Sequence, residues 1–144
     1  MSIPEKIHLE IVTAEKQVYS GDVDSIIVPA LTGYMGILPG HAPLLAELGF
    51  GEIIFTAGDT MEDVFCSWGF VEVLPHRVVI LAQTAELSSD IDLKRAEEAK
   101  ERAEKLLMSG DPNVDYAAAE LVVMRSMSRI HAAQTMADRR KLKQ

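Results

Sequence analysis

Four arginines in the last third of the chain are spaced so that they could bind a multiply charged anion. Arg95 and Arg102 are seven residues apart and Arg125 and Arg129 are four apart, so each pair shares one face if its segment is helical. Two such helices packed as a hairpin would bring four guanidiniums together, and like charges so close require an anion. A triphosphate accepts the forked donors of several arginines, so the spacing indicates a nucleotide phosphate site.

The alternative is that each arginine pairs with a neighbouring carboxylate on a solvated helix face. Arg102 follows Glu98 by four residues, and Arg95 follows Asp92 by three. The sequence contains no G-x-x-x-x-G-K-[ST] phosphate loop, so a nucleotide here would not be bound as in hydrolysing P-loop proteins. From the residues alone, both interpretations stay open.

Catalytic and metal sites have weaker support in the sequence. The four histidines show no paired spacing with cysteine or carboxylates that is typical of a metal site. One enzymatic alternative is a small β-barrel enzyme that uses His41, His76 and Glu72. Cys66 is the only cysteine and lies among apolar residues, so we expect it to be a small buried side chain and not a nucleophile.

The first 87 residues predict a unit of short strands. Ile7, Leu9 and Ile11 alternate with polar residues, as in a half-buried strand, and the same period recurs over residues 23–28. Further β-rich runs cover 52–56, 63–68, 70–74 and 78–82. The Gly- and Pro-rich segment 33–44 predicts a tight connection. Many short strands at close spacing indicate an antiparallel β-sandwich or a barrel over residues 1–87.

From about Ser88 the pattern becomes helical. Small and apolar residues recur at helical spacing over 96–106, with Asp90 or Asp92 as a possible N-cap. Residues 109–113 supply a stop and a turn, and Asp115 is a plausible N-cap for a second helix that runs from about Tyr116 towards Arg140. The expected unit, residues 88–144, is an antiparallel two-helix hairpin. Its expected apolar stripe is mainly alanine on the first helix and Leu121, Val122, Met124 and Ala132 on the second.

Charge divides along the same boundary. Residues 1–91 hold 13 acidic and three basic residues, a net charge of −10, whereas residues 92–144 hold nine acidic and 11 basic residues, a net charge of +2. The acidic front argues against a nucleic-acid partner. No apolar run approaches the roughly 20 residues that cross a bilayer, and the N-terminus lacks the pattern of a secretory signal. We therefore expect a protein on the cytoplasmic side that does not span the membrane.

The segment Gly33-Tyr34-Met35-Gly36-Ile37-Leu38-Pro39-Gly40-His41-Ala42-Pro43-Leu44 resembles the signature loop of ATP synthase epsilon subunits. The resemblance extends through Ile11-Val12-Thr13, Val18-Tyr19, Gly69-Phe70-Val71-Glu72-Val73 and the helical hairpin. It implies a non-catalytic subunit of the F-type ATP synthase, with a sandwich that binds the gamma subunit and the membrane ring of c subunits. It also implies a hairpin that inhibits ATP hydrolysis by lodging among the alpha and beta subunits. The expected location is the cytoplasmic face of the cell membrane, as a peripheral subunit in proton-driven ATP synthesis.

A second motif, Ile91-Asp92-Leu93-Lys94-Arg95-Ala96, resembles the I-D-x-x-R-A pattern of epsilon subunits that bind ATP. The resemblance implies ATP as a regulatory ligand of the closed hairpin, with no catalytic cofactor. The residues that it implies as ATP contacts are Glu86, Ile91, Asp92, Arg95, Ala96, Arg102, Arg125 and Arg129. A scaffold that binds partners through its helices without a nucleotide is the remaining alternative.

Overall fold

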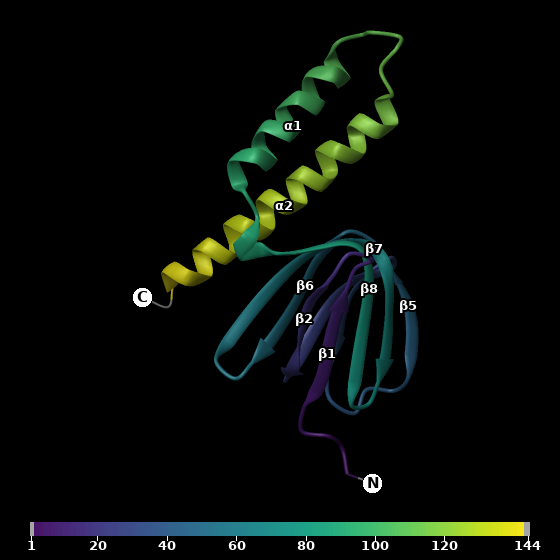
Figure 1. Ribbon diagram of the computed structural model, residues 1–144, viewed down its shortest axis with the longest axis vertical. Coiled ribbons are helices and arrows are strands. Elements are labelled where there is room, and N and C mark those ends of the chain that lie inside the picture. Colours follow the sequence, from purple (N-terminus) through teal and green to yellow (C-terminus); the bar gives the residue numbers. More distant parts are fainter. Residues whose placement is uncertain (1, 143–144) are drawn as a thin grey trace. The chain divides into compact units, whose positions relative to one another are not determined.

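The computed structural model describes residues 2–142 of the 144-residue chain. The chain divides into two compact units between Leu87 and Ser88, and each is described by itself below. The first unit is built of strands and the second of helices (Figure 1). No helix in the described range is long and apolar enough to cross a membrane.

The first unit is the predicted β-sandwich. Its strands are β1 (Ile7–Val12), β2 (Gln17–Val23), β3 (Ser25–Ala30), β4 (Gly33–Ile37), β5 (Leu44–Leu48), β6 (Gly51–Ala57), β7 (Thr60–Leu74) and β8 (Arg77–Leu87). They are hydrogen-bonded in the order β2-β1-β8-β7-β5-β3-β4, and β6 pairs with both β3 and β7. The recorded pairs are antiparallel except β1 with β8, which run parallel, so the antiparallel prediction does not extend to that pair.

Alternating side chains build the core of the sandwich. Ile7, Leu9 and Ile11 on β1 are fully buried, as the two-residue period predicts, while the residues between them face outward. Phe55 on β6 is the largest of the fully buried side chains. Cys66 is also fully buried, and burial raises the pKa of its thiol to about 12. The prediction of an inert apolar cysteine is therefore confirmed.

The segment 33–44 is not one tight connection, so this prediction is wrong in part. Gly33–Ile37 forms β4, which pairs with β3 through a turn at Leu31-Thr32, and Leu44 already begins β5. Only residues 38–43 connect these two strands. Strand pairing over a long stretch of backbone overrode the local turn preference of the Gly and Pro residues.

The two strands expected at 63–68 and 70–74 are one continuous strand, β7. Its first part pairs with β6 and its second part with β5, while β8 follows it on the other edge. Between the two parts Trp68 has a positive φ of 37°, the left-handed value that breaks the local pattern without ending the strand. The break in the two-residue sequence pattern therefore marks the point at which β7 changes its pairing partner from β6 to β5, and not a turn.

The helical unit begins with a single 3-10 turn, Ser88–Asp90, and continues with α1 (Leu93–Met108) and α2 (Tyr116–Leu142). The N-cap of α1 is Asp92 and not Asp90, and Asp115 accepts a hydrogen bond from the Ala118 N–H at 3.0 Å at the start of α2. Between the helices Gly110 has a φ of 67°, which glycine adopts without strain. The predicted hairpin is confirmed.

Candidate functional site

The I-D-x-x-R-A motif forms the start of α1. The Ile91 N–H donates to the Ser88 carbonyl at 3.3 Å, and the Asp92 Oδ1 accepts from the Arg95 backbone N–H at 3.0 Å. The Ala96 N–H then makes a helical bond to the Asp92 carbonyl at 3.0 Å. Four of the eight predicted contact residues thus lie within six consecutive residues, and Asp92 has a structural role there as a helix cap.

Small buried side chains form the seam of the hairpin. Ala96 and Ala103 are buried on α1, and Ala119 and Ser126 are buried on α2, with a spacing of seven residues on each helix. Residues this small allow the helix backbones to approach closely but bury little apolar area. The hairpin is therefore closed by a narrow seam.

The apolar stripe predicted for the second helix is wrong for Leu121 and Met124. Leu121, Val122 and Met124 are exposed, and Ala132 is buried. Val122 nevertheless lines the groove between the two helices. The buried residues of α2 are Ala119, Ser126, Ala132 and Met136. Large apolar side chains that stay exposed are a feature of a surface with further contacts to make.

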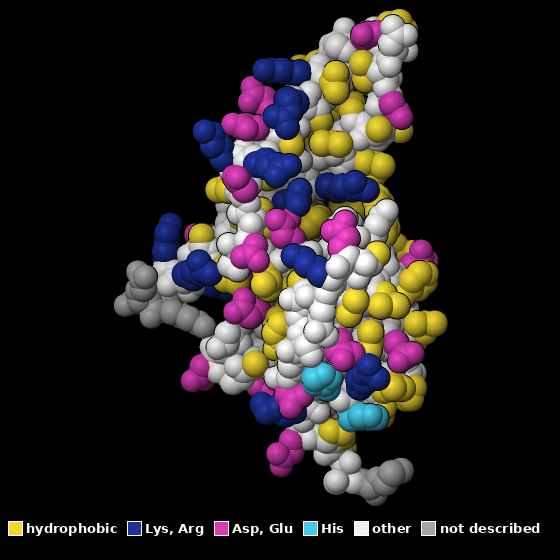
Figure 2. Space-filling view, in the orientation of Figure 1, with side chains coloured by type: hydrophobic (Ala, Val, Ile, Leu, Met, Phe, Trp, Pro, Cys, Tyr) yellow, Lys and Arg dark blue, Asp and Glu magenta, His cyan; other side chains and the backbone are white. Residues whose placement is uncertain are grey.

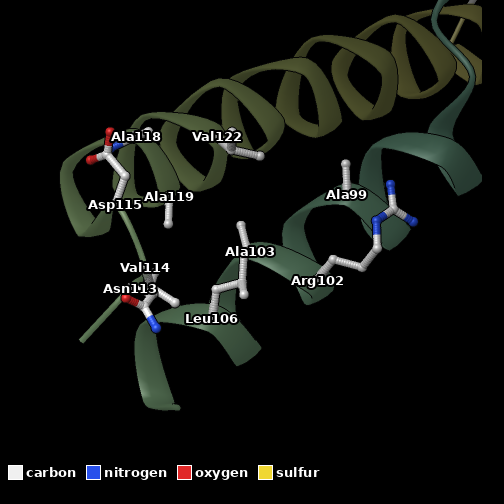
Figure 3. Close-up of a pocket in the computed structure, with 10 residues that line it drawn as sticks. All are labelled: Ala99, Arg102, Ala103, Leu106, Asn113, Val114, Asp115, Ala118, Ala119 and Val122. Atoms are coloured by element: carbon white, nitrogen blue, oxygen red, sulfur yellow. The ribbon is translucent and has the colours of Figure 1, made fainter. Parts of the chain in front are cut away.

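A groove of about 530 Å³ opens between the helices near their connection. Figure 3 shows Ala103 and Leu106 of α1 facing Ala119 and Val122 of α2 across it. Arg102 lies at one end, and its side chain runs along α1 in the direction of Ala99. At this end of the hairpin the side chains of the two helices do not fill the space between them.

Helix geometry puts the four arginines on one side of the seam. Arg95 and Arg102 each precede a seam residue of α1, and Arg125 precedes a seam residue of α2. In an antiparallel pair the second helix runs in the opposite direction and also points its facing residues the opposite way, and these two reversals cancel. The residues that immediately precede the facing positions therefore lie on the same side of the seam in both helices. Arg129 lies one turn further along that face of α2. The hairpin thus offers four guanidiniums on one side.

The competing interpretation, local ion pairs, does not account for the arginines of α1. Within residues 2–142, neither Arg95 nor Arg102 forms an ion pair with the carboxylates of Asp92 or Glu98. The ion pairs of α1 use lysines instead: Lys105 with Glu101 at 3.1 Å and Lys100 with Glu104 at 3.8 Å. Both arginine side chains are exposed.

Glu86 belongs to the other unit. It lies on β8, opposite Phe65 of β7, and its side chain is half-buried. The arginines lie in the helical unit, so the role of Glu86 beside them stays a prediction.

The residues of the enzymatic alternative do not form a catalytic group. His41 lies in the β4–β5 connection, and His76 in the turn between β7 and β8. These loops are neighbours, since the Gly40 N–H donates to the Pro75 carbonyl at 2.8 Å. In the described chain, however, no hydrogen bond or ion pair joins the side chains of His41, His76 and Glu72, and the His41 Nδ1 contacts the Ala42 carbonyl oxygen at 2.7 Å.

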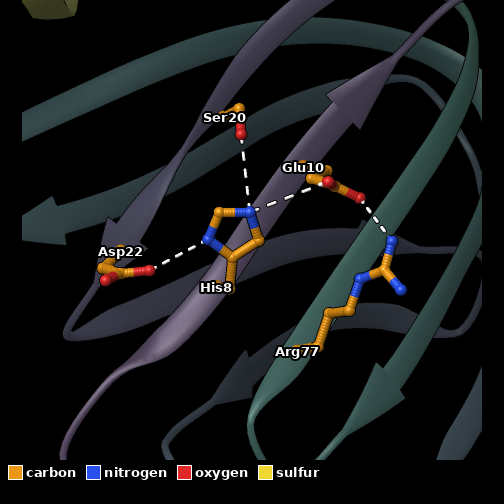
Figure 4. A network of polar contacts seen from close by, with 5 residues as sticks. All are labelled: His8, Glu10, Ser20, Asp22 and Arg77. Carbon is orange, nitrogen blue, oxygen red and sulfur yellow. Dashed lines mark hydrogen bonds and ion pairs between the residues drawn. The ribbon is translucent and has the colours of Figure 1, made fainter.

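A polar network on β1, β2 and β8 was not predicted from the sequence (Figure 4). The His8 imidazole lies between Asp22, at 2.9 Å from Nδ1, and Glu10, at 3.7 Å from Nε2, with Ser20 at 3.5 Å. Arg77 donates to Glu10 at 2.7 Å, and this hydrogen bond lowers the pKa of the Glu10 carboxyl. These residues are far apart in sequence, so only the strand pairing brings them together.

Known families and structures match both units. Residues 6–88 match the family described as ATP synthase, Delta/Epsilon chain, beta-sandwich domain, and residues 89–134 match its long alpha-helix domain. An ATP synthase epsilon chain of Halalkalibacterium halodurans is 47% identical over 128 residues, which cover 88% of this chain and 96% of the relative. An ATP synthase epsilon chain of Syntrophobacter fumaroxidans is 41% identical over 130 residues, which cover 90% of this chain and 97% of the relative.

The fold also resembles a chain in the mitochondrial ATP synthase of Euglena gracilis, with a TM-score of 0.76 at 24% identity over 95% of this chain and 84% of the other. This second likeness supports the fold alone. The sequence relatives go further and exclude the stand-alone enzyme. The chain therefore belongs to the ATP synthase epsilon chain family, as a non-catalytic subunit of that enzyme.

Proposed function

We propose that this chain is the central-stalk subunit that joins the gamma subunit to the c-ring and restrains ATP hydrolysis through its helical hairpin. ATP binds the closed hairpin and opposes its extension towards the alpha and beta subunits. The subunit works at the cytoplasmic face of the cell membrane, as a peripheral part of the motor. The observation that carries the regulatory part is the set of four arginines on one side of a weakly closed seam.

The outer face of the sandwich supports a docking role. Leu45, Phe70 and Leu81 on β5, β7 and β8 are more than half exposed, and the strand register puts Phe70 directly opposite Leu81. Glu47 faces Phe70 on the other side, so acidic groups border the apolar ones. Exposed apolar patches with a polar rim mark protein interfaces. Similar chains have been solved in assemblies titled as F1 with c-ring and as central stalk with c-ring.

The hairpin has the energetics of a conformational switch. Burial of apolar area contributes roughly 25 cal/mol per Å², and a seam of alanine and serine offers little area to bury. Large apolar side chains such as Leu121 and Met124 stay exposed in the closed form and are available to another surface. The free energy that separates closed and extended hairpins is therefore small enough for a ligand to shift.

ATP acts through its preference for the closed form. The triphosphate accepts hydrogen bonds from guanidiniums of both helices, and those of α1 and α2 are neighbours only while the helices pack together. A ligand shifts an equilibrium only by its difference in affinity between two states, and the extended hairpin has no assembled site. A high ATP concentration should thus keep the hairpin closed and allow ATP hydrolysis. A low ATP concentration should let the hairpin extend and restrain hydrolysis.

Charge separates the two units in a way that fits this division of labour. Figure 2 shows Lys and Arg side chains interspersed with Asp and Glu over the helices, while the visible face of the sandwich carries mainly hydrophobic and acidic side chains. A cationic hairpin suits both a triphosphate and acidic protein surfaces.

Isothermal titration of the full chain with ATP tests the nucleotide site. Arg95→Ala and Arg129→Ala should each weaken binding by at least about 1.5 kcal/mol, the loss typical of a charge-assisted contact. Arg140→Ala is the matched control, because it removes the same charge from α2 beyond the level at which α1 begins. It should leave the affinity unchanged.

Two results would reject parts of this proposal separately. Equal binding by wild type, Arg95→Ala and Arg129→Ala would remove the arginine site. Loss of ATP binding without any change in ATP hydrolysis by the reconstituted motor would remove the regulatory role and leave the scaffold alternative. Docking is measured independently, by copurification of the chain with the gamma subunit.

A further inference from the structure

A small pocket on the sandwich is lined by three aromatic side chains. It has a volume of about 290 Å³, and Tyr34, Phe50 and Trp68 surround it together with backbone of Gly33 and Gly49. The rings of Phe50 and Trp68 meet edge to face, with their centroids 5.8 Å apart. None of the lining residues is charged. The pocket belongs to the sandwich alone.

The backbone is strained at Trp68, one of the residues that hold the rings in place. Trp68 adopts a φ of 37°, and its N–H donates to the Gly49 carbonyl at 3.0 Å. A bulky residue in the left-handed region is strained and persists only where its surroundings fix it, often at a binding site. The Tyr34 hydroxyl accepts a hydrogen bond from the Glu52 N–H at 3.3 Å. A Cβ at Gly51 would lie 2.7 Å from that hydroxyl, so only glycine lets the tyrosine lie there.

The net negative charge of the sandwich favours a cation as the ligand of the pocket. Residues 1–87 hold 12 acidic and three basic residues. Two of the basic side chains are engaged elsewhere, Lys6 with Asp24 at 2.6 Å and Arg77 with Glu10 at 2.7 Å. The third, Lys16, lies in the connection between β1 and β2. An acidic body concentrates cations at its surface, and no basic residue of the described chain lines this pocket.

We propose that the aromatic pocket receives the guanidinium of an arginine side chain of a partner protein. Aromatic faces attract cations through the ring quadrupole, and the flat guanidinium can also stack on a ring, which an ammonium does not do. The inference deepens the docking role proposed for the sandwich and rests on it for the existence of a protein partner. It does not depend on the nucleotide site of the hairpin.

Trp68 is the only tryptophan of the chain, so its indole reports on the pocket directly. The full chain, labelled with ¹⁵N, is titrated with N-acetyl-arginine methylamide while the indole N–H signal is followed. The citrulline analogue, which has the same shape without the charge, is the control ligand. Arginine should shift the signal with an affinity at least about threefold higher than citrulline, as expected for one exposed cation–π contact. Equal shifts, or no shift with arginine, would overturn the proposal.

Two variants locate the effect. Tyr34→Leu should reduce the response to arginine to that of citrulline, because it removes one ring and keeps an apolar side chain. Tyr116→Leu is the matched control, since it makes the same change at a tyrosine of the helical unit that does not line the pocket. A loss of the arginine response in both variants would contradict the assignment to the pocket. Copurification with gamma separates the two proposals: a failed titration with intact docking rejects the pocket alone.

Discussion

Replacing Gly69 by alanine is expected to destabilise the sandwich strongly, because this position has no room for a side chain. A Cβ there would lie 1.9 Å from the Leu81 carbonyl oxygen and 2.8 Å from the Ala82 Cα. Gly69 pairs with Ala82 in the β7–β8 ladder, so the obstacle is backbone that cannot rotate away. Since real Cβ atoms essentially never come within 3.0 Å of such atoms, the two strands must separate by about 1 Å at this point.

The expected loss follows from what that separation breaks. One or two ladder hydrogen bonds between β7 and β8 would be lost and their groups left in a dry sheet, at about 1–3 kcal/mol each. One broken bond leaves two such groups, and the resulting loss of about 2–6 kcal/mol is a large part of the 5–15 kcal/mol that stabilises a typical domain. Urea unfolding, followed by far-UV circular dichroism and by the fluorescence of Trp68, measures the change.

Gly36→Ala is the matched control for Gly69→Ala. Gly36 lies in β4 of the same unit, and a Cβ there would meet no atom within 4 Å. The substitution should be neutral or stabilise by up to about 1 kcal/mol, because alanine restricts the unfolded chain. The reasoning is refuted if Gly69→Ala unfolds within about 0.5 kcal/mol of the wild type.

Two further predictions concern single polar residues. The Arg77 hydrogen bond holds the pKa of Glu10 below its ordinary 4.5, so this pair stabilises the fold above that pH and the contribution disappears as the pH falls through the lowered value. Unfolding measured on both sides of pH 4.5 should show a shallower acid loss for Glu10→Gln than for wild type, and identical slopes would contradict the assignment. Asp92→Ala should destabilise the helical unit by about 1 kcal/mol through loss of its N-cap, whereas Asp92→Ser, which caps equally well, should not. Thermal unfolding by circular dichroism distinguishes these two variants.

Sequence patterns correctly predicted the elements whose structure depends on residues close together in the sequence. The alternation of Ile7, Leu9 and Ile11 depends only on which side of a strand faces the core. Asp115 caps a helix through a backbone N–H three residues away. In both cases the contacts that fix the structure lie within the segment itself or follow from its period.

Pairing between distant strands could not be predicted in the same way. From the sequence, Gly69 was expected to separate two strands. The sequence does not show that β8 lies so close to β7 at this position that a side chain has no room. The parallel pairing of β1 with β8 and the network of His8 likewise depend on which strands become neighbours. Among the candidate site residues, those on α1 were placed by helical spacing, whereas the role of Glu86 depends on the arrangement of two units.

In the motif at the start of α1, some residues have a structural role and others have none that the fold explains. Asp92 and Ala96 are fully accounted for without a nucleotide, one as a helix cap and the other as a seam residue. The side chain of Arg95 has no such task, since it is exposed and forms no ion pair with Asp92 in the described chain. Substituting Asp92 therefore changes the stability of the hairpin, and with it any ligand that binds only the closed form. Substituting Arg95 leaves the cap and the seam intact, so a change in ATP affinity there reports on the phosphate contact itself.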